Sequence, residues 1–208
     1  MTTHLTLETA NTPASIKQPM VTIVVVPRER FSYSQQSLES VYAETDYPFE
    51  LVYVDGGSSP ELKAYLETQA SEKQFKLIRT EHFLSPNRAR NIGIQAARGK
   101  YIVFVDNDVL VQKGWLQKLV DCAEETNATV VGTLTCIDSP IHEVVHNGGG
   151  TTYIEVRTEG TKTGRYAVQT SYLAGKRVSK IAEELTRFKC EFVEFHTALV
   201  RESFFDEH

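Results

Sequence analysis

Two aspartates, separated by a single residue, close the most apolar stretch of the chain. Asp106 and Asp108 follow residues 101–105, whose aromatic and β-branched side chains are typical of a strand. Because strand positions i and i+2 face the same side, both carboxylates can converge on one point. Two carboxylates suit a hard cation such as Mg²⁺, which also takes substrate phosphate oxygens. The same Asp-Asn-Asp cluster suits a plain turn after a strand, so the spacing alone leaves both interpretations open.

The composition is that of an ordinary globular protein with one domain. The 208 residues are 41% hydrophobic and 24% charged, which is enough for a sizeable core. The net charge of -5 argues against a sequence-independent nucleic-acid binder, which needs clustered basic residues. Cys122, Cys136 and Cys190 form no CxxC pair, which disfavours a disulfide framework or a structural zinc site. We therefore expect buried thiols and a cytoplasmic protein.

The chain shows no membrane-spanning segment. No apolar run reaches the length that crossing a bilayer requires, and a peripheral membrane contact stays open. Residues 1–19 are polar and lack the hydrophobic region of a signal peptide, so they predict a flexible leader.

Strand and helix patterns alternate through the first two thirds of the chain. Apolar runs predict strands at residues 21–26, 49–54, 75–79, 101–105 and 129–134. Helical spacing predicts helices at residues 34–43, from Pro60 onward, at 87–98 and from Trp115 onward, with Ser58 or Ser59 as a cap and Gly99 as a C-terminal glycine. Such alternation indicates an α/β domain with a mostly parallel sheet.

The positions that follow three of these strands carry polar residues or proline. Pro27, Asp55 and Asp106 each come directly after a strand. Ligands of parallel sheets bind beyond the carboxyl ends of the strands, so we expect these three residues at one edge. Beyond Cys136 glycines interrupt the pattern, which predicts a hairpin, a short helix and late strands. These elements are expected at residues 151–157 with 165–170, at 179–185, and at 192–195 and 198–200.

Four segments, in this order, resemble family 2 glycosyltransferases. They are VTIVVV at 21–26, SLESV at 37–41, FELVYVDGGS at 49–58, and NRARNIGIQAARGKY at 87–101, which runs into the Asp-Asn-Asp cluster. The resemblance implies the GT-A fold, a Rossmann-like three-layer α/β sandwich with a mostly parallel central sheet and a hairpin-rich C-terminal part. It also implies one domain, with a nucleotide-sugar-binding half at 20–136 and an acceptor-side part at 137–208 that is incomplete.

The resemblance implies a reaction as well. Family members transfer a sugar from a nucleotide diphosphate to an acceptor hydroxyl. Asp106 and Asp108 match the carboxylates that hold Mn²⁺ or Mg²⁺ against the diphosphate, where the metal neutralises charge on the departing oxygen. The implied acceptor is a saccharide or a lipid-linked molecule. The donor-binding residues that the resemblance implies are Val26, Pro27, Asp55, Arg90 and Asn107.

Two of these residues have alternative roles. Asp55 matches an acidic position that binds the nucleoside, but it can also cap the turn before Pro60. Arg90 matches an arginine near the base and phosphates, where a guanidinium can pair a phosphate bidentately. An exposed helix face would explain Arg90 as well as it explains Arg88 and Arg98.

The tail offers weaker matches. His146 lies in a His-x-Gly-Gly element, where it could touch a phosphate or metal, although a histidine in such a turn is more often structural. His196 takes the place of a small residue in relatives and could shape the acceptor pocket. Glu191 and Glu194 are acidic candidates there, with a solvated strand face as the simpler explanation.

The chain departs from the family pattern at three places. Pro27-Arg28-Glu29-Arg30 replaces the usual Pro-Thr-Tyr-Asn-Arg, and Gly56 replaces a second carboxylate. Inverting members keep their general base in a Glu-Asp motif after Gly-Gly-Phe-Asp-Glu, whereas this sequence stops at Phe204-Phe205-Asp206-Glu207-His208. Either Asp206 and Glu207 form a compressed motif or the base lies downstream, so no catalytic residue is named.

Three functions follow in order of preference. The first is an inverting, metal-dependent glycosyltransferase. The second is a non-catalytic nucleotide-sugar-binding or scaffold module, favoured by the missing base. A nucleotidyltransferase ranks last because residues 27–30 lack the glycines of its phosphate-binding loop.

Overall fold

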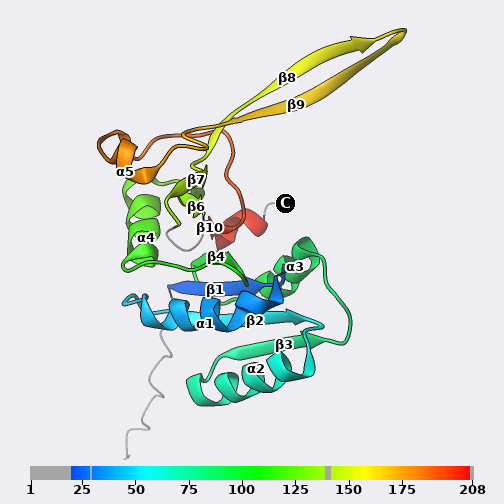
Figure 1. The fold of residues 1–208 in the computed structure, drawn as a ribbon. Coiled ribbons are helices and arrows are strands. Elements are labelled where there is room, and N and C mark those ends of the chain that lie inside the picture. Colours follow the sequence, from blue (N-terminus) through cyan, green and yellow to red (C-terminus); the bar gives the residue numbers. More distant parts are fainter. Residues whose placement is uncertain (1–19, 29, 139–141, 207–208) are drawn as a thin grey trace, which may run out of the picture.

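The computed structural model describes residues 20–28, 30–138 and 142–206, and its centre is a six-stranded sheet (Figure 1). The strand order is β3-β2-β1-β4-β10-β5. The strands are β1 (Val21–Val26), β2 (Glu50–Gly56), β3 (Lys76–Thr80), β4 (Tyr101–Asp106), β5 (Val130–Gly132) and β10 (Thr197–Arg201). β10 runs antiparallel to β4 and β5, and the other paired strands are parallel. The predicted leader at residues 1–19 lies outside the described residues.

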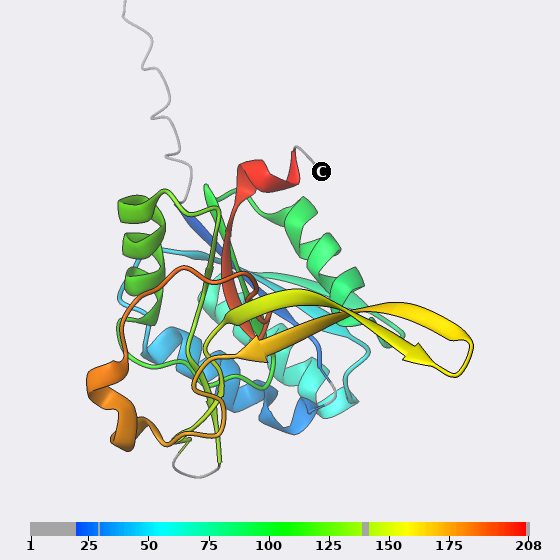
Figure 2. The same cartoon turned by 90° about the horizontal axis from the view of Figure 1, so that it is seen from above.

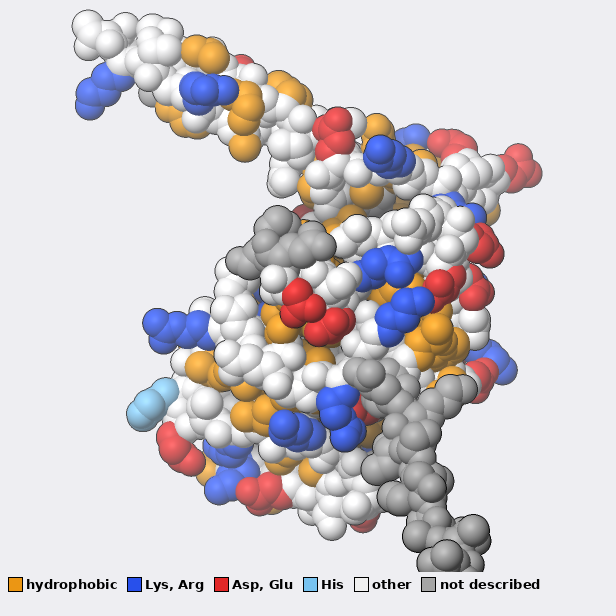
Figure 3. All heavy atoms as spheres, turned by 180° about the vertical axis from the view of Figure 1, so that it is seen from behind, with side chains coloured by type: hydrophobic (Ala, Val, Ile, Leu, Met, Phe, Trp, Pro, Cys, Tyr) orange, Lys and Arg blue, Asp and Glu red, His pale blue; other side chains and the backbone are white. Residues whose placement is uncertain are grey.

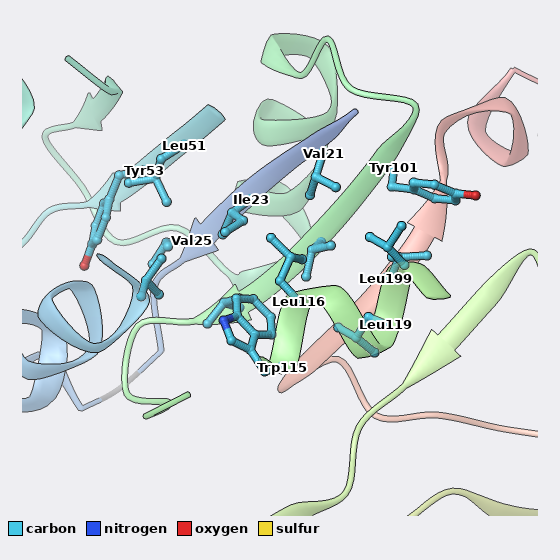
Figure 4. Close-up of a cluster of buried hydrophobic side chains, with 14 of the residues drawn as sticks. Val21, Ile23, Val25, Leu51, Tyr53, Tyr101, Trp115, Leu116, Leu119 and Leu199 are labelled. Atoms are coloured by element: carbon cyan, nitrogen blue, oxygen red, sulfur yellow. The ribbon is translucent and has the colours of Figure 1, made fainter. Parts of the chain in front are cut away.

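Helices cover both faces of this sheet. α1 (Ser34–Ala43), α2 (Pro60–Lys73) and α4 (Trp115–Thr126) pack on one face, and α3 (Pro86–Ala96) packs on the other. A short 3-10 helix, Phe31–Tyr33, precedes α1. Figure 4 shows Trp115 and Leu116 of α4 near Ile23 and Val25 of β1, and Leu119 of α4 beside Leu199 of β10. This three-layer arrangement confirms the predicted α/β fold class. Within the described residues, no helix combines the length and apolar character that crossing a bilayer would require.

Local sequence signals account for most element boundaries. α1 spans the predicted residues, and the side-chain oxygen of Ser59 caps α2 by accepting from the backbone N–H of Leu62 at 3.3 Å. All six residues of β1 are buried, as its run of apolar residues predicts for a strand covered on both faces.

Three expectations from the sequence are wrong. Residues 192–195 form no strand, because only Phe192 pairs, in an isolated bridge with Gly150. Gly99 does not close α3, since the helix ends at Ala96 in extended backbone. Instead, a Cβ at Gly99 would lie 2.6 Å from the backbone N of Thr22, so glycine is needed there for close approach. The three cysteines are half-buried rather than fully buried.

A glycine in α3 sets the distance between this helix and the sheet. A Cβ at Gly93 would lie 2.1 Å from Cγ1 of Val24 in β1. We expect Gly93→Ala to lower the free energy of unfolding by about 1–3 kcal/mol, because the added methyl overpacks a buried contact. Denaturant unfolding measures this loss. The double variant Gly93→Ala with Val24→Ala should recover part of it, and an unchanged stability of Gly93→Ala would contradict the packing argument.

The C-terminal part leaves the sheet and then returns to it. Its elements are β6 (Thr135–Ile137), β7 (Val144–Asn147), β8 (Gly150–Glu159), β9 (Lys162–Ser171) and α5 (Val178–Ile181), with short 3-10 helices at Ala182–Glu184 and Glu202–Phe205. The chain then enters β10 between β4 and β5. The predicted hairpin is therefore confirmed, and the expected helix at 179–185 is split into α5 and a 3-10 turn.

The β8–β9 hairpin projects away from the rest of the molecule (Figures 1 and 2). Hydrophobic side chains continue along it in the space-filling view (Figure 3). Tyr153, Ile154, Val156 and Tyr166 are between 45% and 62% exposed. A two-stranded ribbon without a covering layer adds little to stability in water.

Shortening this hairpin should therefore leave the rest of the fold intact. Tyr153 pairs with Val168, so Asn-Gly in place of residues 154–167 closes a two-residue turn between them. We expect the thermal unfolding midpoint to move by less than about 2 °C, because the removed side chains have little packing to lose. A fall of more than about 5 °C would show that the hairpin packs against the domain.

Candidate functional site

The carboxyl ends of β1, β2 and β4 meet at one edge of the sheet, here called the carboxyl edge. In the parallel pairing, Val26 lies beside Asp106, and Val25 lies beside Tyr53, two residues before Asp55. The backbone N–H of Asn107 donates to the carbonyl of Val26 at 2.9 Å and holds the two strand ends together. The expectation that Pro27, Asp55 and Asp106 share one edge is confirmed.

Asp106 is buried at this edge among cationic side chains. Its Oδ1 accepts from Nη2 of Arg90 at 3.1 Å. Its Oδ2 lies 3.0 Å from Nδ1 of His196 and 3.6 Å from Nε of Arg28. The hydrogen bond with Asp106 raises the pKa of His196 above its ordinary value. Asp106 therefore organises a cluster of positive groups at the end of β4.

Arg90 projects from α3 across the edge and is only 12% exposed. Besides Asp106, it contacts the side-chain oxygen of Asn87 at 3.0 Å and stacks over the ring of Phe195 at 5.1 Å. Burial lowers the pKa of Arg90, and the charge of Asp106 opposes that effect. Its position excludes the simple solvated helix face, because Asp106 of β4 and Phe195, which precedes β10, hold the side chain against the edge.

Asp108 lies in a turn rather than on the strand. β4 ends at Asp106, and the backbone N–H of Val109 donates to the carbonyl of Asp106 at 3.1 Å, which closes the turn. Strand alternation therefore does not reach Asp108. Among the described residues, no side chain is hydrogen-bonded to the Asp108 carboxylate or forms a close ion pair with it. Burial and then the nearby charge of Asp106 raise its pKa, and the charges of Arg30 and Arg28 and a backbone hydrogen bond oppose this shift. A nearby cation would stabilise the ionised form of this half-buried carboxylate, and carboxylate oxygens are ligands that divalent metals such as Mg²⁺ prefer.

Asn107 fixes the loop that follows β1. Its Oδ1 accepts from the backbone N–H of Arg28 at 2.8 Å, and its Nδ2 donates to Oγ of Ser34 at 2.7 Å. The Asn107 side chain is buried, as are Val26 and Pro27. These three residues form the floor between β1 and β4, and Arg28 stands above it, 34% exposed.

Asp55 is engaged within the protein. Its oxygens accept from the backbone N–H of Ser58 at 3.1 Å, from Oγ of Ser58 at 2.8 Å, and from Nη1 of Arg79. Arg79 reaches across from β3 and also donates from Nη2 to the Ser58 carbonyl at 2.9 Å. Asp55 is 1% exposed, so this buried pair closes the turn between β2 and α2.

Gly56 has a packing reason to be glycine. A Cβ there would lie 2.9 Å from the backbone N of Leu84 and 3.0 Å from Cγ of Pro27. The loop between β3 and α3 fills the space that an acidic side chain would need. A second carboxylate next to Asp55 would therefore require this loop to move.

A cleft lies elsewhere on the molecule. It has a volume of about 700 Å³ and is lined by residues at the amino ends of β2 and β3, among them Phe49, Glu50 and Lys76. Asp55 and Asp106 lie at the opposite ends of their strands. We place the functional site at the carboxyl edge, because the charged groups converge there.

Three residues of the site carried little or no signal in the sequence. Arg28 stood out only as a departure from the family pattern, although its place two residues after β1 could have indicated the carboxyl edge. His196 was a weak match, 90 residues from Asp106. Arg79 had no signal, because only the pairing of β2 with β3 brings it to Asp55.

Sequence comparison relates the chain to sugar-transferring proteins. The model of glycosyl transferase family 2 matches residues 22–205. The succinoglycan biosynthesis protein ExoO of Rhizobium meliloti is 32% identical over 120 residues, which are 58% of this chain and 34% of that protein. The putative glycosyltransferase EpsH of Bacillus subtilis is 27% identical over 158 residues, 72% of this chain and 46% of that protein. The chain thus spans less than half of either relative.

Solved structures share the architecture. The mannosyltransferase PcManGT from Pyrobaculum calidifontis, in complex with GDP-Man and Mn²⁺, has a TM-score of 0.57 at 16% identity, covering 92% of this chain and 47% of that chain. Residues 1–349 of TarS from S. aureus have a TM-score of 0.53 at 18% identity, and the match covers 90% of this chain and 48% of that chain. At these identities the likeness concerns the fold alone.

Proposed function

The chain belongs to glycosyl transferase family 2 and has the GT-A fold, and we propose that it binds a nucleotide-diphosphate sugar and transfers the sugar, with inversion, to an acceptor hydroxyl. Residues 20–136 would bind the donor, and the part that follows would face a saccharide or lipid-linked acceptor. A cytoplasmic location stays a prediction from the cysteine content.

The observation that carries the proposal is the contrast between the two aspartates. Asp106 is buried and paired with Arg28, Arg90 and His196, whereas the Asp108 carboxylate has no such partner in the described part of the chain. We assign Asp108 to a divalent cation, Mn²⁺ or Mg²⁺, with Asp106 at its side. When bound, such an ion would neutralise charge on the diphosphate.

The arginines have a separate role in this proposal. Arg28 and Arg90 are held at the carboxyl edge by Asp106, so their positions are set before the donor arrives. A preorganised guanidinium loses little reorganisation energy when it pairs a phosphate oxygen. The Asp55 carboxylate would accept a hydrogen bond from the nucleoside in addition to those that it accepts from Ser58 and Arg79. Val26, Pro27 and Asn107 would form the surface beneath the donor.

Titration calorimetry with UDP-GlcNAc and GDP-mannose, with and without Mn²⁺, tests the proposal. We expect one of them, or another sugar nucleotide of a wider panel, to bind more tightly when Mn²⁺ is present. Arg90→Lys should weaken this binding at least about tenfold, because lysine cannot pair bidentately. Arg88→Lys, on the exposed face of the same helix, is the matched control and should bind as the parent does. Absence of metal-dependent binding across the panel would overturn the proposal.

A non-catalytic nucleotide-sugar-binding module is the second candidate. It is favoured by Gly56, where the loop at Leu84 leaves no room for a second carboxylate. Of the expected acidic pair, Asp206 follows the last 3-10 turn, and Glu207 lies outside the described residues. Metal-dependent donor binding without donor hydrolysis or transfer, in a chain extended to the length of its relatives, would support this second candidate.

A further inference from the structure

Three side chains from two distant segments meet beside the carboxyl edge. His146 lies on β7, and Glu194 and His196 lie in the segment that leads into β10. One nitrogen or oxygen atom from each of these residues lies within 4.8 Å of the others. The two imidazole rings are 5.3 Å apart at their centroids.

The distances within this cluster match metal coordination. Nε2 of His196 lies 3.2 Å from Oε2 of Glu194, and Nε2 of His146 lies 3.4 Å from the same oxygen. Two ligand atoms on a tetrahedral zinc ion, with bonds of about 2.0–2.1 Å, are about 3.3 Å apart. Both observed edges therefore already have the length that a shared ion would impose. His146 is 43% exposed, so its ring has room to complete the third edge.

Possible ligand atoms of the three residues face one another. An ionised carboxylate only accepts hydrogen bonds, so Nδ1 of His196 carries the hydrogen that it shares with Asp106. Nε2, the other ring nitrogen, faces Oε2 of Glu194 at 3.2 Å. Oε2 of Glu194 is buried and accepts no hydrogen bond from the described residues. One possible ligand atom from each of the three residues therefore lies near a common point.

A divalent ion can satisfy all three residues at once, because each of them offers it one ligand atom. The hydrogen bond from His196 to Asp106 is the outer contact that orients a metal-binding histidine.

From this geometry we propose that His146, Glu194 and His196 form a binding site for a divalent transition-metal ion of the zinc class, separate from the cation assigned to Asp108. Two histidines and a glutamate are a donor set that zinc accepts, with a fourth position left for an oxygen ligand. The ion would fasten β7 to the segment before β10. It would thereby fix the C-terminal part against the end of β4, since the backbone N–H of Asp106 donates to the His196 carbonyl at 3.0 Å.

The test uses the full chain, stripped of metal with a chelator and free of nucleotide. Co²⁺ serves as the spectroscopic probe, and Zn²⁺ serves in thermal unfolding. We expect one Co²⁺ per chain with visible ligand-field bands. We also expect Zn²⁺ at about a hundredfold excess over its dissociation constant to raise the unfolding midpoint by about 5–10 °C.

Variants separate this site from its neighbours. His146→Ala and Glu194→Gln should each weaken Co²⁺ binding at least about tenfold, while their metal-free circular dichroism matches the parent. His82→Ala, which removes an exposed histidine elsewhere, and Asp108→Asn should keep both the bands and the Zn²⁺ shift. The proposal is overturned if the parent shows no bands and no shift, if His146→Ala and Glu194→Gln bind as the parent does, or if Asp108→Asn abolishes binding.

Discussion

Asp108→Asn is expected to remove the metal-dependent part of donor binding and to leave the fold at least as stable as before. The carboxylate is half-buried beside Asp106, and no other side chain of the described residues is hydrogen-bonded to it or forms a close ion pair with it. Its pKa is raised, so its charge costs stability in the metal-free protein. Asparagine removes that charge and with it the principal ligand of the assigned cation. In saturating Mn²⁺ we expect the donor affinity to fall by roughly 10–100-fold, to the value measured without metal.

Calorimetry and thermal unfolding of the same samples measure both effects. Asp46→Asn makes the same chemical change at an exposed position on the opposite edge of the sheet, where it lines the large cleft. This control should retain the Mn²⁺ dependence. If Asp108→Asn also retained it, the assignment of Asp108 to the cation would be wrong. If it lost both binding and a few degrees of thermal stability, Asp108 would be a structural residue instead.

Arg79→Met is expected to produce the largest loss of stability. It leaves the 1% exposed carboxylate of Asp55 without its ion-pair partner and removes the hydrogen bond to the Ser58 carbonyl. Removing one partner of a buried pair typically costs about 3–5 kcal/mol, because the remaining charge stays buried. A domain with about 5–15 kcal/mol in total would lose a large part of its stability. Denaturant unfolding measures the change.

A surface ion pair provides the comparison. Arg187 and Glu125 are also paired, but their side chains are 52% and 61% exposed, so Arg187→Met should unfold at nearly the same denaturant concentration as the parent. The double variant Arg79→Met with Asp55→Asn should be more stable than Arg79→Met alone, because no unpaired charge remains. A loss below about 1 kcal/mol for Arg79→Met would contradict this argument, because it would mean that water reaches the Asp55 carboxylate despite its burial.

Features that depend on local interactions could be predicted from the sequence. They include the buried strands β1 and β4, the extent of α1 and the Ser59 cap, because each depends on residues close to it in the chain. Parallel strands put their carboxyl ends at one edge, which is why Pro27, Asp55 and Asp106 could be placed together beforehand. The role of Arg90 could be guessed by motif but not argued, since a solvated helix face explained it equally well.

Contacts between distant segments decided the rest. Sequence spacing placed Asp106 and Asp108 on one face of a strand, but the turn after β4 separates a buried, paired carboxylate from an open one. Arg79 meets Asp55 only through strand pairing, and His146 meets His196 only because β10 returns to the sheet beside β4. The sequence alone therefore determined the α/β architecture and the edge that carries the chemistry. Which charges pair there, and which stay open to a ligand, depends on side chains that packing brings together across tens of residues, and only the tertiary structure specifies those distances.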